Sequence, residues 1–121
     1  MLEEARLHLV SVGAIKDLDA TGAYSLLYDA ARKAVAAHML AKGYRSAPNR
    51  PGAHAAVVAY AAAALKARRL DDIIRGFDRM RRTRHRVEYE SAIVGSQQID
   101  ADLERARSIV DLVEKSWPSS K

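Results

Sequence analysis

Apolar residues recur every three or four positions along nearly the whole chain, and this period constrains the fold more than any other feature. Such spacing gathers apolar side chains on one side of an α-helix, which has 3.6 residues per turn. Alanine is abundant, β-branched residues are sparse, and no stretch alternates as a half-buried strand does. The sequence therefore predicts an all-α fold, an antiparallel bundle of four to five helices in up-and-down order.

Five segments are predicted to be helical, at residues 2–16, 20–42, 53–65, 70–91 and 96–117. The first has an apolar face made of Leu2, Ala5, Leu9, Val12 and Ile15. The second has the most continuous stripe, made of Tyr24, Leu27, Tyr28, Ala31, Val35 and Met39. Residues 53–65 are so uniformly small and apolar that they indicate a buried helix. The last helix follows a break at Gly95, has Ser96 as its expected N-cap, and buries Ile99, Leu103, Ala106, Val110, Val113 and Trp117.

The length of 121 residues and the 49 % hydrophobic content suit one domain spanning residues 1–121. Two prolines make residues 43–52 its clear loop, and residues 118–121 are expected to form a frayed tail. There is no cysteine, which excludes disulfides and thiolate chemistry. The N-terminus lacks a basic leader and no apolar run reaches the roughly 18 residues of a membrane span, so a cytoplasmic location is expected.

The charge balance favours a polyanionic partner. Twenty Lys and Arg stand against 15 Asp and Glu, a net charge of +5 with a pI near 9.7. The most basic stretch is RRTRHRVEYE, at residues 81–90. Acidic residues are interleaved with its arginines, and a solvated, salt-bridged helix face has the same composition. Both interpretations stay open at this point.

The position of Arg84 on its helix is unusual. At 100° per residue, with Ile73 at zero, Phe77 lies at about 40°, Met80 at about 340°, Val87 at about 320° and Arg84 at about 20°. Arg84 is thus predicted in the middle of the apolar face. An inward guanidinium, which cannot lose its proton, needs carboxylates, carbonyls or an anionic ligand.

Two interpretations of Arg84 follow. It pairs with Glu88 or with an acid of another helix and holds the bundle in register, or it contacts phosphate or RNA. His85 and Tyr89 lie one turn apart at the edge of the apolar face and are candidates to line one cleft with it. A histidine suits proton transfer, and a tyrosine suits base stacking or acceptance of a nucleotidyl group. On their own, however, a histidine and a tyrosine on the flank of a helix are more often ordinary boundary residues.

Other site types have no support in the sequence. There is no dinucleotide-binding, P-loop or serine-hydrolase motif. His8, His38 and His54 lie on different predicted helices without zinc-site spacing, so neither a metal nor a cofactor is expected. Asp71 and Asp72 fit the first turn of a helix rather than a catalytic pair.

Three features together resemble the HEPN superfamily of small helical domains, over roughly residues 20–117. They are the helix AYSLLYDAARKAVAAHMLAKGYR, the apolar helix opening at GAHAAVV, and RHRVEYE followed by an amphipathic helix. The resemblance implies a dimeric, metal-independent ribonuclease whose motif is an Arg with a His four to six residues beyond. It also implies a toxin paired with a nucleotidyltransferase antitoxin.

Carried onto this chain, the motif is degenerate. Arg84 matches the arginine, His85 stands where an Asn is common, and Tyr89 falls where the histidine is expected. Pairing Arg79 with His85 restores the spacing but moves the arginine off the inward face. A tyrosine, with a reference pKa near 10, is a poor general base at neutral pH. The Arg…Glu-Tyr form of the segment resembles a HEPN branch in which nucleotide or RNA binding, or a partner role, replaces cleavage.

The leading hypothesis is a cytoplasmic homodimer of toxin type that acts on or binds RNA or nucleotides. Its candidate catalytic residues are Arg84, His85 and Tyr89, and its candidate phosphate-binding residues are Arg81, Arg82 and Arg84. The alternative is a non-catalytic module that binds a nucleotide or a protein partner, with Tyr89 accepting a nucleotidyl group. In a third hypothesis Arg84 is only a structural ion-pair residue.

Overall fold

The computed structural model describes residues 2–41, 70–115 and 117, and the side chains among them except those of residues 70–74. It contains four helices and no strand in this part of the chain: α1 (Leu2–Ile15), α2 (Ala20–Ala41), α4 (Leu70–Tyr89) and α5 (Ser96–Lys115). The predicted all-α helical fold is confirmed. The predicted loop at 43–52, the helix at 53–65 and the tail at 118–121 lie outside the described residues.

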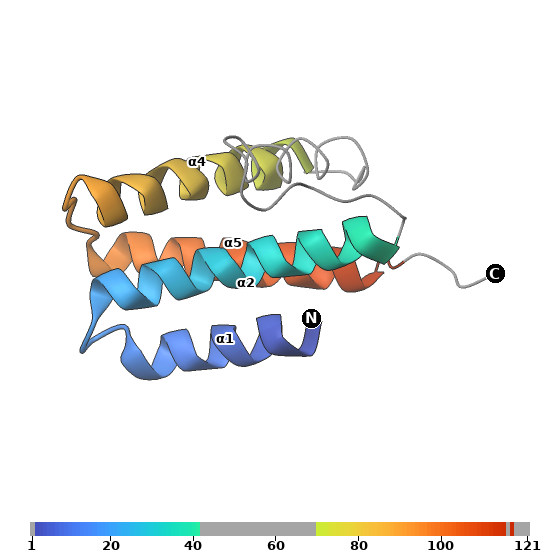
Figure 1. The fold of residues 1–121 in the computed structure, drawn as a ribbon, viewed down its shortest axis with the longest axis horizontal. Helices are drawn as coiled ribbons and strands as arrows, with labels where there is room; N and C mark the ends of the chain where they lie inside the picture. The colour runs from blue at the N-terminus through green and yellow to red at the C-terminus, as the bar shows by residue number, and fades with distance from the viewer. Residues whose placement is uncertain (1, 42–69, 116, 118–121) are drawn as a thin grey trace.

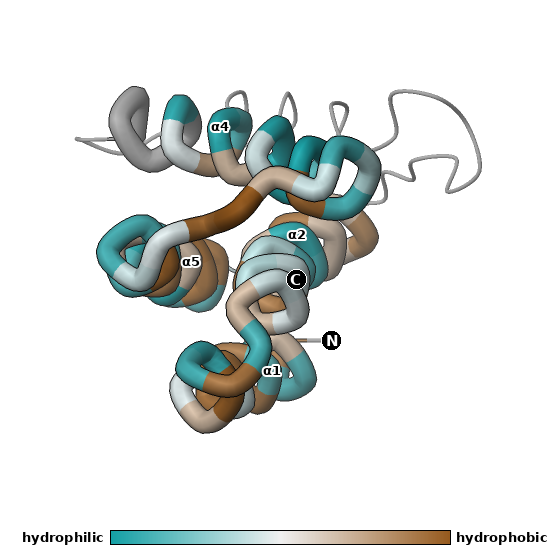
Figure 2. Tube along the Cα trace, turned by 90° about the vertical axis from the view of Figure 1, so that its left-hand side faces the viewer, coloured by the Kyte–Doolittle hydropathy of each residue, from teal (hydrophilic) through white to brown (hydrophobic). Residues whose placement is uncertain are grey.

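The four helices form a bundle in which α2 and α5 occupy the middle (Figure 1). Seen from the end of the bundle, α1 lies on one side of this pair and α4 on the other (Figure 2). Each outer helix contacts both middle helices, and α1 and α4 do not touch each other. The outer helices run opposite to the middle ones (Figure 1), so α1 is antiparallel to α2 and α4 is antiparallel to α5.

The core surrounds α2, the most buried of the four helices. All six residues of its predicted stripe are buried, as are several of its alanines, which let the neighbouring helices approach closely. Helix α1 buries Ala5, Leu9 and Val12, and the partly buried Leu2 and Ile15 pack against the same core. The α1 and α2 faces read from the sequence are therefore confirmed.

Helix α5 buries five of the six residues expected of it, and Trp117 is the exception. Trp117 lies beyond Lys115, where α5 ends, and is 45 % exposed. Its ring still meets His38 edge-on, with centroids 6.2 Å apart. The helix begins at Ser96, but the Gly95 carbonyl accepts the first helical bond, from Ile99 N–H. The N-cap is therefore Gly95 and not Ser96.

A polar network that was not predicted from the sequence joins α2 and α5 inside the bundle. Tyr24 Oη donates to Asp102 Oδ2 at 2.7 Å, and Arg105 Nη1 lies 2.5 Å from Asp102 Oδ1. Asp102 is only 2 % exposed, so both oxygens of a buried carboxylate have a partner, as a buried charge requires. At Gly76 of α4 an added Cβ would lie 2.9 Å from Arg105 Cδ. The absence of that carbon lets α4 pack against this network.

The helix ends are held by local bonds. Asp19 caps α2, since its carboxylate accepts from Gly22 N–H at 2.9 Å and its carbonyl accepts from Ala23 N–H. At the other end of the bundle α4 ends at Tyr89, and Ser91 takes a left-handed conformation with φ of 54°. Two N–H groups, those of Glu90 and Ala92, donate to the Arg86 carbonyl, which turns the chain toward α5. Within residues 2–41 and 70–115, no helix has an apolar stretch that could cross a membrane.

Candidate nucleic-acid interface

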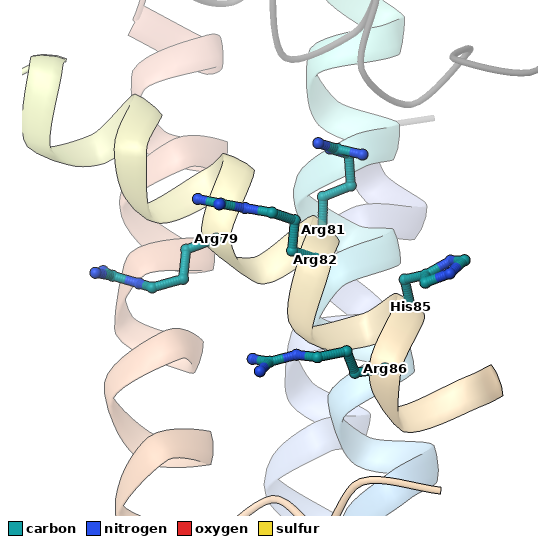
Figure 3. A pocket seen from close by; sticks show the side chains of 5 residues that line it. All are labelled: Arg79, Arg81, Arg82, His85 and Arg86. Atoms are coloured by element: carbon teal, nitrogen blue, oxygen red, sulfur yellow. The ribbon is translucent and has the colours of Figure 1, made fainter. Parts of the chain in front are cut away.

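The outward face of α4 is concave and cationic. A pocket of about 590 Å³ lies on it, and among the described residues its lining consists of Arg79, Arg81, Arg82, His85 and Arg86. We call this the α4 pocket. Figure 3 shows Arg79, Arg82 and Arg86 extending to one side of the helix and Arg81 and His85 to the other. The volume is within the range of small-molecule sites, and the lining chemistry is that of an anion site.

The arginines of the α4 pocket differ in how far they are neutralised. Arg81 lies 3.0 Å and Arg82 3.3 Å from the Asp78 carboxylate. Within the described part of the chain, Arg79 and Arg86 have no carboxylate within ion-pair distance. Arg86 donates to Thr83 Oγ1 at 3.4 Å. Four guanidiniums against the one carboxylate paired with them leave a charge of +3 on this surface.

His85 and Tyr89 form an exposed aromatic pair at the end of α4. Their ring centroids are 4.8 Å apart and the ring planes meet at 45°. The predicted one-turn neighbourhood of the two residues is therefore observed. Tyr89 is 69 % exposed, and His85 belongs both to this pair and to the lining of the α4 pocket. The pair thus extends the cationic surface with two aromatic rings.

Arg84 lies on a different side of α4, against α2. Its side chain is 22 % exposed, with Nη1 2.8 Å from Glu88 Oε2 and Nε 3.8 Å from Asp29 Oδ1. Asp29 is shared with Arg32, whose Nε lies 3.7 Å away. The Arg84 guanidinium also lies over the Tyr28 ring, 5.8 Å from its centroid. Two arginines and two carboxylates balance in charge here, so this cluster does not need an outside anion.

The predicted trio therefore divides into two places. His85 and Tyr89 come together on the outward face, whereas Arg84 points toward α2 and is not among the residues lining the pocket. The inward position predicted for Arg84 fits its partial burial, and its Glu88 and Asp29 contacts match the ion-pair interpretation. Arg81 and Arg82, both predicted to bind phosphate, lie in the α4 pocket together.

Arg86 was missed as a candidate site residue, and Arg79 was set aside because it lies off the inward face, although both line the pocket. The sequence feature that could have identified them is their spacing. Arg79, Arg82 and Arg86 stand at i, i+3 and i+7, at about 240°, 180° and 220° on the same projection, which places them on one outward face. The inward Arg84 was the more unusual feature of the sequence, because charged residues are seldom buried. The site-like surface lies on the solvent side of the helix.

The described residues contain no group of three or more His, Asp or Glu side chains placed to hold a metal ion. No protein-family model matches the chain, and neither a curated protein nor a solved structure shows significant similarity to it.

Proposed function

We propose that this protein binds RNA, with the α4 pocket as the site that holds the phosphate backbone. The observation that carries the proposal is the set of four arginines that line one pocket on α4, two of them without a carboxylate partner among the described residues. Guanidinium groups match phosphate oxygens with two parallel hydrogen bonds. A fixed row of them suits a ligand whose charges repeat at regular intervals, as in a nucleic acid.

The overall charge supports the same partner. The chain has a net charge of +5, and a surplus of this sign raises the rate of encounter with a polyanion. Arg79 and Arg86 are expected to supply the strongest attraction, because among the described residues no carboxylate has to be displaced before they meet a phosphate. Arg81 and Arg82 have to share their charge with Asp78. RNA binding is therefore expected to depend more on Arg79 and Arg86 than on Arg81 and Arg82.

The test is binding of a fluorescently labelled RNA hairpin, which offers both a stem and a loop, measured by anisotropy over a range of salt concentrations. We expect Arg79→Gln/Arg86→Gln to weaken binding and to lower the slope of log K against log salt by about 1.5, near the 0.7–0.9 per phosphate contact. A matched control, Arg107→Gln/Lys115→Gln, removes the same charge from exposed positions on α5. If both double variants weaken binding equally, the attraction is diffuse and the α4 pocket is not the site.

Cleavage is a second candidate activity, favoured by the place of His85 among the arginines. Among the described residues that line the pocket, His85 is the one whose side chain suits proton transfer. In such a reaction the pocket arginines would hold the phosphate and His85 would move the proton, whereas Arg84 would only stabilise the fold. Incubation with total RNA in the presence of a chelator tests this. Cleavage that His85→Ala abolishes while RNA binding survives would support a metal-independent ribonuclease. If the wild type cleaves no RNA, binding without cleavage remains as the proposed function.

The resemblance to HEPN domains extends the proposal to partners. It suggests a cytoplasmic homodimer that acts as the toxin beside a nucleotidyltransferase antitoxin, and Tyr89 is exposed enough to accept a nucleotidyl group. Sedimentation equilibrium of the purified protein tests the dimer. Incubation with a nucleotidyltransferase and nucleoside triphosphate, followed by intact-mass measurement of wild type and Tyr89→Phe, tests the modification.

A further inference from the structure

We infer that the RNA held at the α4 pocket is single-stranded, and that one of its bases stacks on the aromatic pair of His85 and Tyr89. This inference rests on the proposed function and names the class of RNA. Its starting point is that the aromatic pair shares His85 with the cationic pocket. A phosphate site and a base-sized platform are therefore continuous on one helix face.

The aromatic pair is shaped to receive a third ring. Tyr89 is 69 % exposed, so a large part of its surface is open to a ligand. The 45° angle and 4.8 Å separation show that His85 does not lie flat on it, which leaves ring surface of both residues uncovered. Base stacking on aromatic side chains contributes strongly to single-strand binding and tolerates any sequence, because every base has a π-face.

The ending of α4 keeps the platform accessible. Tyr89 is the last helical residue, and the chain turns away toward α5 through Ser91 in the left-handed conformation. No further helical turn therefore follows that could cover the ring along the helix axis. Arg86 lies three residues before Tyr89 and Arg82 seven before, on the same outward face. A base on Tyr89 thus has guanidiniums within reach of its neighbouring phosphates.

A double helix cannot use this arrangement. In A-form RNA the base faces are hidden in the stack, and proteins meet phosphates and 2′-hydroxyls instead. The surface from Arg79 to Tyr89 covers ten residues of rise, about 15 Å at 1.5 Å per residue. That length matches about four nucleotides of a single strand at roughly 3.4 Å per stacked nucleotide. The aromatic pair and the pocket arginines together therefore favour a strand with unpaired bases, whose phosphates lie along α4.

The test compares a labelled single-stranded 12-mer with the same strand in a perfect duplex, using anisotropy at several salt concentrations. A 2-aminopurine in the single strand reports stacking through fluorescence quenching. We expect Tyr89→Ala to weaken single-strand binding about 5- to 100-fold, to abolish the quenching, and to leave the duplex affinity and the salt slope unchanged. Tyr89→Phe is expected to restore most of the affinity lost with alanine, because the ring alone makes the stack.

Ile93→Ala is the matched control, since Ile93 is a highly exposed apolar residue of the α4–α5 connection that does not line the pocket. Circular dichroism and thermal melting check that each variant folds. Wild type that binds duplex as tightly as single strand, or Tyr89→Ala without effect on the single strand, would overturn the stacking inference while leaving the RNA-binding function in place. Failure of the wild type to bind either RNA would overturn both.

Discussion

The guanidinium of Arg84 lies over the ring of Tyr28, with its Cζ 5.8 Å from the ring centroid. The same group is flanked by Asp29 of α2 and Glu88 of α4. A cation over an aromatic face, with carboxylates beside it, ties α4 to α2 at the edge of the core. The arginine that is most unusual in the sequence thus has a structural explanation, and the function is expected elsewhere on the same helix.

Replacing Arg84 should therefore cost stability and not RNA affinity. We expect Arg84→Ala to lower the free energy of unfolding by about 1–3 kcal/mol, less than for a fully buried pair because the side chain is partly solvated. Arg82→Ala, at a more exposed position on the same helix, should cost about 0.5 kcal/mol or less. Urea denaturation measures the free energy of unfolding of both variants, and anisotropy measures their affinity for RNA. An Arg84→Ala protein of unchanged stability that no longer binds RNA would return Arg84 to the phosphate-binding set.

Arg84 also illustrates how far the sequence could predict this site. Helical periodicity placed it on the inward side of its helix, beside Phe77 and Met80, and the structure has both of these buried. Periodicity could not identify Asp29 as its partner, because that contact joins helices far apart in the chain. Nor could it show that the outward arginines surround a pocket, which depends on how the helices are arranged in space.

The hydrogen bond from Tyr24 to Asp102 should be one of the larger polar contributions to stability. Tyr24→Phe removes a bond to a buried carboxylate without creating a cavity, and we expect it to cost roughly 1.5–3 kcal/mol. A double-mutant cycle with Asp102→Asn measures the coupling between the two side chains at neutral pH. Strictly additive effects in the cycle would mean that the 2.7 Å contact contributes no net interaction energy. The same denaturation experiment on Tyr89→Phe, an exposed tyrosine, serves as control.

The buried tyrosines should make the protein sensitive to alkali. Burial raises the pKa of Tyr28 to about 12, and burial together with the bond to Asp102 raises the pKa of Tyr24. In the unfolded chain a tyrosine loses its proton near pH 10. The stability contributed by these groups is therefore complete below about pH 10 and falls as the pH rises toward 12, by about 1.4 kcal/mol per pH unit for each tyrosine.

Tyr28→Phe should remove one tyrosine's share of this alkaline loss. The measurement is the free energy of unfolding in urea at pH 9, 10 and 11 for wild type, Tyr28→Phe and Tyr89→Phe. As the pH rises, the free energy of unfolding should fall less for Tyr28→Phe than for the wild type. Tyr89→Phe, which removes a hydroxyl from an exposed tyrosine, is the control variant. Parallel pH profiles for all three proteins would contradict the assignment.

The sequence was most informative where one helix face decides burial, and least where contacts cross between helices. The stripe of α2 and the faces of α1 and α5 followed from their period. Asp102 was overlooked because an acid in a polar helix usually faces solvent, and only the approach of Tyr24 and Arg105 shows why it is buried. The N-cap of α5 was displaced by one residue, since serine and glycine both suit that position.

Ser91 offers a stabilising substitution, and it also tests the end of α4. Its φ of 54° is in the left-handed region, where a side chain is strained and glycine is not. We expect Ser91→Gly to raise the free energy of unfolding by about 0.5–1 kcal/mol, because relief of the strain outweighs the added freedom of the unfolded chain. Ser108→Gly in α5 is the contrasting control and should destabilise by a similar amount. If Ser91→Gly destabilised the protein instead, the turn that leaves Tyr89 at the helix end would not have the left-handed geometry on which the open aromatic platform depends.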